Sequence, residues 1–211
     1  MIAVIAVALA LQSGATLLPL DEIGTYERGD YDRSATECDR LAAHPADPER
    51  VGEGVSRAAM DLDAAIAACE AAVEADPENP RLNYQLARAY GYSGRHAEGQ
   101  PSRDVALAAG YPQSLFVVGY IRVTGWDGRG ADPCYGGELI RRSAHAGRFA
   151  GLVGFPHYAL QGAFEGCETA PEIDTAEMLG FLETAAERAD GFYQGLLVEQ
   201  LTTRVEMMDA E

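Results

Sequence analysis

The stretch of this chain that most resembles a reactive loop is "GWDGRG", residues 125–130, with Cys134 close behind it. A phosphate-binding loop needs G-x-G-x-x-G after a strand, or G-x-x-x-x-G-K-[ST], because these glycines let backbone N–H groups approach the phosphate. The stretch has neither pattern, and its single Asp does not supply the alternating oxygen ligands of a calcium loop. We therefore expect a corner between two helices, in which Gly125 ends the first helix and Asp132 with Pro133 opens the second.

The other side chains that could act in catalysis form no recognisable constellation. The four histidines share no spacing, which favours exposed or capping positions over metal ligands or general bases. No cysteine lies in a C-x-x-C or zinc-finger spacing, and no G-x-S-x-G is present. The 33 acidic residues could form a carboxylate pair in many places and so single out none. The four histidines are His44, His96, His145 and His157. The sequence therefore indicates no catalytic residue, no cofactor and no metal.

The charge of the chain limits its partners. The 211 residues carry a formal net charge of −17, and all 16 basic residues are Arg. Nucleic acids and anionic membranes repel such a surface, so neither is an expected partner.

The first residues have the form of a secretory leader. An apolar run from Ile2 to Leu11 precedes Ser13, Gly14 and Ala15, which fits a signal peptide over residues 1–15. The run is shorter than the roughly 20 residues that a membrane helix needs, so we expect no stable membrane insertion after cleavage. No Lys or Arg precedes the run, which a wrongly assigned start codon would explain. Four cysteines fit an oxidising compartment and allow three pairings, and we expect a periplasmic or secreted protein.

The patterns of apolar residues predict an all-α fold. A helix is expected from about Asp32 to Ala43, followed by a loop over residues 44–60. Helices at residues 61–76, 80–94 and 95–110 follow, separated by Pro and Gly signals. We thus expect an N-terminal helix and loop over residues 16–60 and a helical repeat domain over 61–211, which a helix at Phe192 to Met208 closes.

Two adjacent segments resemble known helical repeats. A shift of 37 residues superposes Gly110 on Gly147 and Gly125 on Gly162. Residues 80–112 resemble a tetratricopeptide repeat, and "SLFVVGYIRVTG" with "DPCYGGELIRRSAHAG" resembles a Sel1-like repeat, although the unit that begins at Gly151 departs from the pattern. The resemblance implies a right-handed solenoid of antiparallel helix pairs, in which each unit stacks on its neighbours.

The same arrangement implies a disulfide pairing. Cys134 would begin one helix and Cys167 would follow the next, so that both lie at one end of the stack, within the reach of a disulfide. Cys38 and Cys69 would lie in two successive antiparallel helices. We therefore expect Cys38 to pair with Cys69 and Cys134 with Cys167.

The resemblance also suggests a binding surface. Tetratricopeptide-like units bind partners along a concave groove, and aromatic and Arg side chains are enriched at binding hot spots. We interpret the chain as a non-enzymatic binding scaffold for a protein or peptide partner. The other interpretation of these residues is that the Tyr rings pack between repeats while the Arg residues form ion pairs at the rim. The alternative functions are an accessory or regulatory subunit of an envelope enzyme, and a weak hydrolase that uses carboxylates in the groove. The groove positions are Arg81, Tyr84, Arg88, Tyr92, Phe116 and Tyr120.

Overall fold

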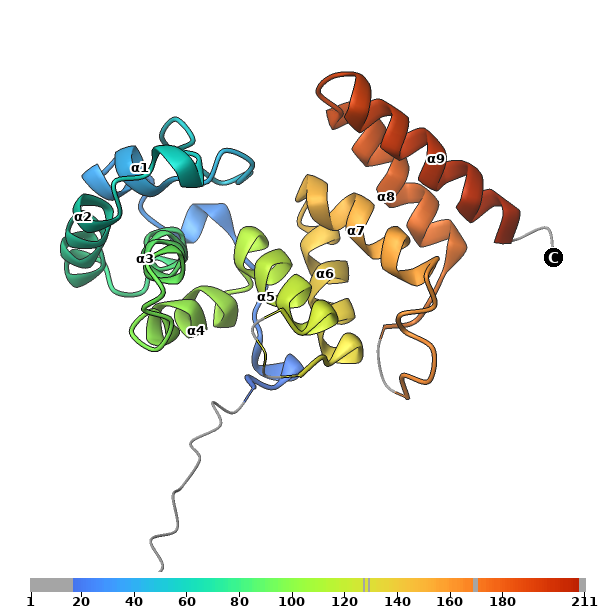
Figure 1. Cartoon of the computed structure of the whole chain (residues 1–211), viewed down its shortest axis with the longest axis horizontal. Helices are drawn as coiled ribbons and strands as arrows, with labels where there is room; N and C mark the ends of the chain where they lie inside the picture. The colour runs from blue at the N-terminus through green and yellow to red at the C-terminus, as the bar shows by residue number, and fades with distance from the viewer. Residues whose placement is uncertain (1–16, 127, 129, 169–170, 209–211) are drawn as a thin grey trace, which may run out of the picture.

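The computed structural model describes residues 17–126, 128, 130–168 and 171–208, and all regular secondary structure in these ranges is helical (Figure 1). The expected all-α class is confirmed for this part of the chain, whereas the expected signal peptide lies outside it. The helices are α1 (Glu37–Ala42), α2 (Leu62–Ala75), α3 (Pro80–Tyr92), α4 (Gln100–Ala108), α5 (Pro112–Thr124), α6 (Pro133–His145), α7 (Phe149–Ala159), α8 (Thr175–Arg188) and α9 (Phe192–Met208). Short 3-10 turns occur at Leu20–Glu22, Arg28–Asp30 and Arg57–Ala59.

The helices pack mainly against their neighbours in the chain. Each helix contacts the next one from α1 through α9, and α1 also contacts α3 while α7 contacts α9. Figure 1 shows α1 to α4 gathered around the N-terminal half, α5 and α6 side by side in the centre, and α8 and α9 as a hairpin at the far end. No helix of the described ranges is sufficiently long and apolar to traverse a bilayer.

The first helix is shorter than the sequence predicts. The expected start at Asp32 is wrong, because the Asp32 carboxylate accepts hydrogen bonds from the backbone N–H and the hydroxyl of Ser34, 2.8 Å each, and so stabilises a turn. α1 begins only at Glu37, where Thr36 and Asp39 form a reciprocal capping box. The residues before α1 therefore remain irregular, and their backbone carbonyls need donors from elsewhere.

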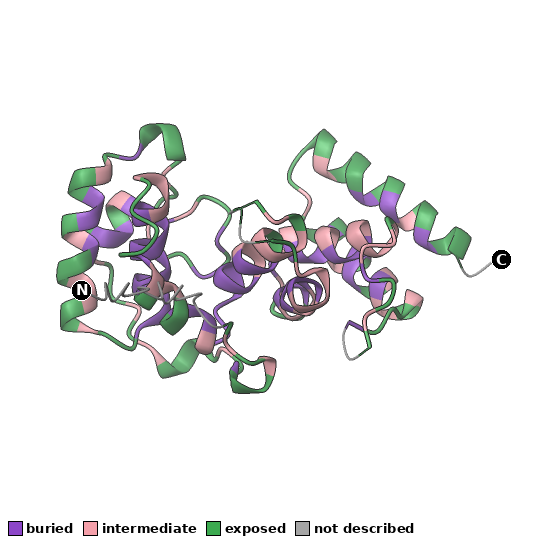
Figure 2. Cartoon of the chain, turned by 60° about the horizontal axis from the view of Figure 1, so that its bottom comes forward, coloured by how far each residue is buried: buried purple, intermediate pink, exposed green. Residues whose placement is uncertain are grey.

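Helix α3 is the most buried helix of the N-terminal half. It begins at Pro80 after the cap Asn79, as expected for a helix with Pro at its first position. Every residue from Pro80 to Tyr90 is buried, polar ones included. Figure 2 shows buried stretches, in purple, among the helices of the N-terminal half. The buried polar side chains of this helix therefore need hydrogen-bond partners in the surrounding segments.

The glycine-rich segment after α5 is a helix corner in its described residues. Gly125 ends α5 in the left-handed conformation, with φ 65°, and Asp132 caps α6 by accepting from the Tyr135 N–H at 3.0 Å. The two helices approach so closely that a Cβ on Gly119 would lie 2.7 Å from the Gly136 carbonyl oxygen. The expected corner is thus confirmed, and glycines allow the tight α5–α6 contact.

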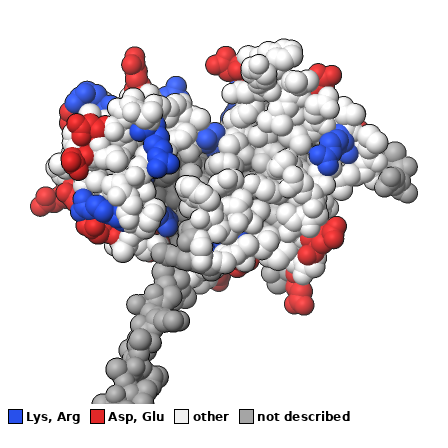
Figure 3. Space-filling view, in the orientation of Figure 1, with Lys and Arg blue, Asp and Glu red and all other residues white. Residues whose placement is uncertain are grey.

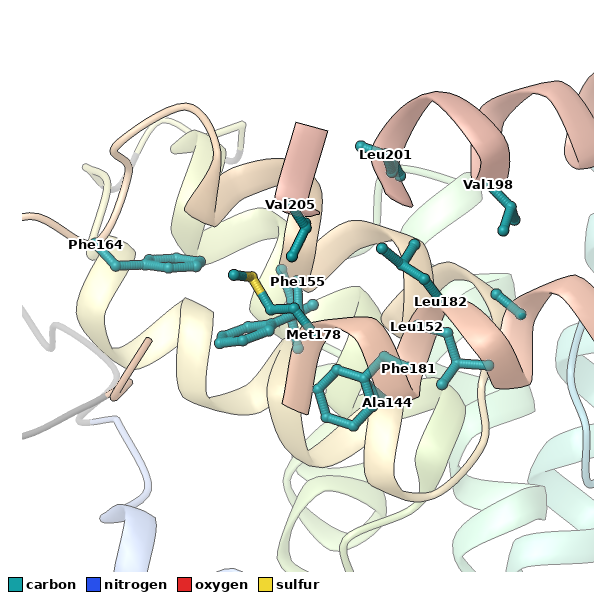
Figure 4. Close-up of a cluster of buried hydrophobic side chains, with 12 residues drawn as sticks. Ala144, Leu152, Phe155, Phe164, Met178, Phe181, Leu182, Val198, Leu201 and Val205 are labelled. Atoms are coloured by element: carbon teal, nitrogen blue, oxygen red, sulfur yellow. The ribbon is translucent and has the colours of Figure 1, made fainter. Parts of the chain in front are cut away.

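Two apolar cores lie at opposite ends of the molecule. One packs α1, α2 and α3 around Cys38, Cys69 and Leu82. The other joins α6 to α9, and Figure 4 shows Phe155, Met178 and Phe181 among its side chains. A third, smaller cluster holds the N-terminal segment against α4, α5 and α6 through residues such as Ile23 and Leu139.

Backbone contacts fix that N-terminal segment along the helices. The Tyr135 hydroxyl donates to the Leu18 carbonyl at 2.8 Å, and Arg142 donates to the Leu20 carbonyl at 2.8 Å. The Gly24 N–H donates to the Ala108 carbonyl at 2.8 Å. The first described residues therefore lie against helices that are about 100 residues away in sequence.

Both expected disulfides are present. Cys38 and Cys69 connect α1 to α2 with a Cα–Cα distance of 4.5 Å. Cys134 and Cys167 connect the start of α6 to the segment after α7 with a Cα–Cα distance of 5.5 Å. The pairing that the helix arrangement implied is confirmed.

Replacing both Cys38 and Cys69 by Ala should lower the free energy of unfolding by about 2–4 kcal/mol, because the bridge restricts the unfolded chain. Chemical denaturation followed by far-UV circular dichroism measures this loss. Cys134→Ala with Cys167→Ala provides a matched comparison, because the two bridges span separations of 31 and 33 residues. Free thiols in the native protein, or unchanged stability of the first variant, would contradict the prediction.

Candidate functional site

A pocket of about 400 Å³ lies between α3 and α5, and the irregular segment after α1 closes one side of it. Its cationic or ionisable lining side chains come from distant parts of the sequence, and none of its lining residues within the described part of the chain is Asp or Glu. This composition is unusual for a chain with a formal net charge of −17. Figure 3 shows basic side chains along the hollow between the N-terminal helices and the centre, whereas acidic side chains lie mostly at the outer edges of this face. The basic and histidine residues of the lining are His44, Arg57, Arg88, His96 and Arg103.

Arg88 provides fixed positive charge beside the pocket. Its side chain is only 7% exposed, and its guanidinium donates to the backbone carbonyls of Ala42, Ala43 and Val55 at 2.8, 3.1 and 2.7 Å. Carbonyl oxygens satisfy N–H donors without neutralising the cation. Arg88 thus anchors the loop and keeps its full charge.

Arg57 and Arg88 share one aromatic ring. Each guanidinium carbon lies 5.0 Å from the centroid of the Tyr92 ring, a distance typical of cation–π contacts. Unlike Arg88, Arg57 is exposed, and no hydrogen bond or carboxylate from the described residues engages its guanidinium. Arg57 therefore presents its planar fork of donors at the pocket, held in place by Tyr92.

His44 is neutral in this environment. Burial, and then the charges of Arg88 and Arg148, lower its pKa from 6.5 to about 4. Its Nδ1 accepts a hydrogen bond from the Ala46 N–H at 3.1 Å, so the neutral ring carries its proton on Nε2. At neutral pH, His44 can donate one hydrogen bond without adding charge.

The opposite wall of the pocket is apolar and ends at an exposed aromatic ring. Val117, Val118 and Ile121 of α5 line it, together with Ala87 of α3. Trp126, just after α5, also lines the pocket and is 71% exposed. The pocket thus has a basic side and an apolar side, which is the composition of a site for an amphipathic anion.

A buried polar cluster underlies the pocket. The Tyr111 hydroxyl donates to the Asp47 carboxylate at 2.8 Å, and burial raises the pKa values of Asp47 and of the neighbouring Tyr84. Arg148 donates to the Gln113 side chain, and burial lowers the Arg148 pKa. These contacts fix the position of the Tyr84 ring, which lines the pocket, relative to α5 and α7.

The structure separates the groove positions expected from the sequence. Tyr84, Arg88 and Tyr92 line the pocket. Phe116 and Tyr120 lie on another face of α5, where their rings stack with centroids 6.2 Å apart and a Cβ on Gly154 of α7 would lie 3.4 Å from the Phe116 ring. Tyr120 is 39% exposed there and does not line the pocket.

Arg81 lies away from the pocket in a buried ion pair. It is 2% exposed, pairs with Asp39 of α1, and also donates to the carbonyls of Asp32 and Ser34 at 3.3 Å each. Asp39 additionally accepts from the Gln85 side chain at 2.9 Å. Burial alone would raise the Asp39 pKa, but these hydrogen bonds outweigh it and lower that pKa below its usual value. The position of Arg81 therefore favours the interpretation that this residue has a structural role.

Sequence reasoning missed most of the pocket lining, including its basic and aromatic residues His44, Arg57, His96, Arg103 and Trp126. Arg103 lies on α4, whereas the other four lie outside the α-helices, and no repeat position marks them. The one available signal was the single Trp of the chain within a glycine-rich corner.

Comparison with protein-family models, with curated proteins and with solved structures gives no match to the chain. Within the described ranges, no group of three or more His, Cys, Asp or Glu side chains is placed to hold a metal ion. The pocket geometry is therefore the main observation from which a function can be argued.

Arg81→Gln should lower the free energy of unfolding by about 3–5 kcal/mol, because it leaves the Asp39 carboxylate buried without its cation. Urea denaturation measures the change. Arg40→Gln is the matched control, since Arg40 forms an exposed ion pair with Glu37 on α1 and should change stability little. Equal stability of the two variants would contradict a structural role for Arg81.

His44→Gln should remove a pH dependence of stability. A histidine whose pKa is lowered on folding stabilises the protein above its unfolded pKa of about 6.5, and this stabilisation is lost as the pH falls toward 4. The wild type should therefore lose on the order of 1–2 kcal/mol relative to His44→Gln between pH 7 and pH 4, after allowance for partial exposure. Denaturation curves of both proteins across this range test the prediction, and parallel pH profiles would refute it.

Proposed function

We propose that the protein is a non-enzymatic binding scaffold, and that the pocket between α3 and α5 engages an anionic group of a protein or peptide partner. The observation that carries this proposal is a pocket whose described lining includes three arginines and two histidines but neither Asp nor Glu, in a strongly acidic chain. Charge complementarity of this kind selects partners and speeds their association. Arg57, Tyr92 and Trp126 are also of the residue types that most often carry binding energy.

We also propose that the helices form a right-handed stack of antiparallel pairs related to Sel1-like and tetratricopeptide repeats. Packing between successive helices supports this arrangement. The 37-residue spacing supports it further, because Gly110 and Gly147 both adopt positive φ, as do Gly125 and Gly162. Such a frame would hold the pocket walls at fixed positions.

An oxidising compartment outside the cytoplasm is the proposed location. The two disulfides are consistent with it. Periplasmic export depends on the leader expected at residues 1–15.

A hydrolase that uses groove carboxylates receives no support from this pocket. The lining residues that the structure describes include neither Asp nor Glu, so they supply no carboxylate pair for acid–base chemistry. Binding is the function that these side chains serve best.

Ile121→Glu should abolish capture of the partner, because it puts a negative charge into the apolar wall and repels the anionic group. Affinity capture from an envelope extract, with quantitative mass spectrometry, compares this variant with the wild type. Val105→Glu on α4 is the matched control, since Val105 is 37% exposed and does not line the pocket. Proteins that the wild type and Val105→Glu retain and Ile121→Glu loses would be the partners. Capture profiles that do not differ between the two variants would contradict the proposal.

A further inference from the structure

We propose that the pocket between α3 and α5 is also a binding site for a free organic carboxylate that has an apolar or aromatic body. This inference goes beyond a protein scaffold, because such a ligand would occupy the pocket without any polypeptide partner. The size of the pocket, the donors that face the pocket and the electrostatics of the surrounding helix ends support such a site.

The size of the pocket fits a small molecule. Its volume of about 400 Å³ lies within the range of roughly 300–1,000 Å³ that is typical of ligand sites. Segments from α3, α5 and the region between α1 and α2 line it and leave it partly open to solvent, so part of the surface of a small ligand would leave water.

Arg57 is the residue that fits the carboxylate. A guanidinium offers a planar fork of N–H donors that matches the two oxygens of a carboxylate. The Tyr92 ring, 5.0 Å away, orients the Arg57 guanidinium without consuming these donors. Arg88 is committed to the carbonyls of Ala42, Ala43 and Val55, so it contributes mainly its positive field.

The helix ends favour a singly charged anion over a phosphate. Two C-terminal helix ends line the pocket, that of α3 through Gly91, Tyr92 and Gly94 and that of α5 through Trp126, whereas Ser114 is the one described lining residue from the first three positions of an α-helix. Helix C-termini carry partial negative charge, whereas phosphate sites commonly use helix N-termini. Neutral His44 adds one donor and no charge. This environment suits a monoanion held by one accessible guanidinium.

The apolar wall fits the body of the ligand. Val117, Val118 and Ile121 would contact an aliphatic or aromatic group, and the exposed Trp126 ring would cover it at the mouth. A small hydrophilic anion such as acetate would leave this wall in water. The two sides of the pocket therefore specify a carboxylate and an apolar group in the same molecule.

Trp126 provides a direct readout, because it is the only Trp of the chain. The experiment titrates the disulfide-bonded protein with 4-phenylbutyrate, with its neutral amide, with 4-phenylbutylphosphonate and with acetate, by calorimetry and by Trp emission. We expect 4-phenylbutyrate to bind and to shift the Trp126 emission to shorter wavelength. The amide should bind about tenfold or more weakly, since a hydrogen bond to a charged group contributes about 1.5–3 kcal/mol. Acetate and the phosphonate should bind more weakly than 4-phenylbutyrate.

Two variants assign the binding to the proposed residue. Arg57→Gln should weaken 4-phenylbutyrate binding at least tenfold, and Arg57→Lys should restore part of the loss. Arg40→Gln, which removes another exposed Arg outside the pocket, should leave binding unchanged. Because Arg57 is exposed and its described contact is with one ring, Arg57→Gln should keep the wild-type circular dichroism spectrum.

Several results would overturn the inference. The inference is wrong if 4-phenylbutyrate does not bind at millimolar concentration, or if its amide binds equally well. It is also wrong if the phosphonate binds more tightly, or if Arg57→Gln binds 4-phenylbutyrate like the wild type. Tighter binding of a capped peptide with one internal Glu than of 4-phenylbutyrate would also overturn it, and would instead support a peptide-borne carboxylate.

The two proposals can fail separately. If the acids do not bind but partner capture still depends on Ile121, the scaffold stands and the small-ligand site falls. If 4-phenylbutyrate binds through Arg57 but Ile121→Glu and Val105→Glu capture the same proteins, the small-ligand site stands and the scaffold falls.

Discussion

The polar face of α3 is the constraint on which the N-terminal half depends. Arg81, Gln85 and Arg88 follow one another on this helix at spacings of four and three residues, so they share one side of it. They donate to the Asp39 carboxylate and to backbone carbonyls between Asp32 and Val55. Those irregular residues have no helix or sheet partners for their carbonyls, and an unpaired buried carbonyl is costly. The side chains of α3 therefore serve the role that regular secondary structure serves elsewhere.

The pocket follows from this arrangement. Arg88 donates hydrogen bonds to the carbonyls of Ala42, Ala43 and Val55. His44 follows the first two of these residues in the chain and Arg57 follows the third closely, so the same bonds position both side chains at the pocket. Because its acceptors are neutral, the anchoring interaction leaves a positive charge beside the cavity. The same arginine thus stabilises the loop and adds charge beside the pocket, while the acidic residues of the described ranges lie outside its lining.

Sequence signals that act over a few residues gave reliable predictions. Phe192 and Met208 bound the last helix as expected, and Gly125 and Asp132 mark the corner. Each of these depends on spacing within one or two turns of chain. The start of the first helix was predicted wrongly at Asp32. The Asp32 carboxylate instead stabilises a turn with Ser34, and the capping box at Thr36 starts the helix at Glu37. Both disulfides were predicted from the resemblance to helical repeats, which implies that these cysteines lie within bonding reach, and both are present.

The sequence by itself determined the helical class and the corner between the helices around Gly125 and Asp132, and the resemblance to helical repeats gave the pairing of the cysteines. Only the tertiary structure decided that Arg81 is buried in an ion pair, that Arg88 faces both a loop and a pocket, and that Arg57 and Trp126 belong to the same site. Helix periodicity gives the direction of a side chain around its own axis, but it does not specify which distant segment lies opposite. That choice depends on long-range packing and on where unpaired carbonyls find donors, which no local spacing encodes.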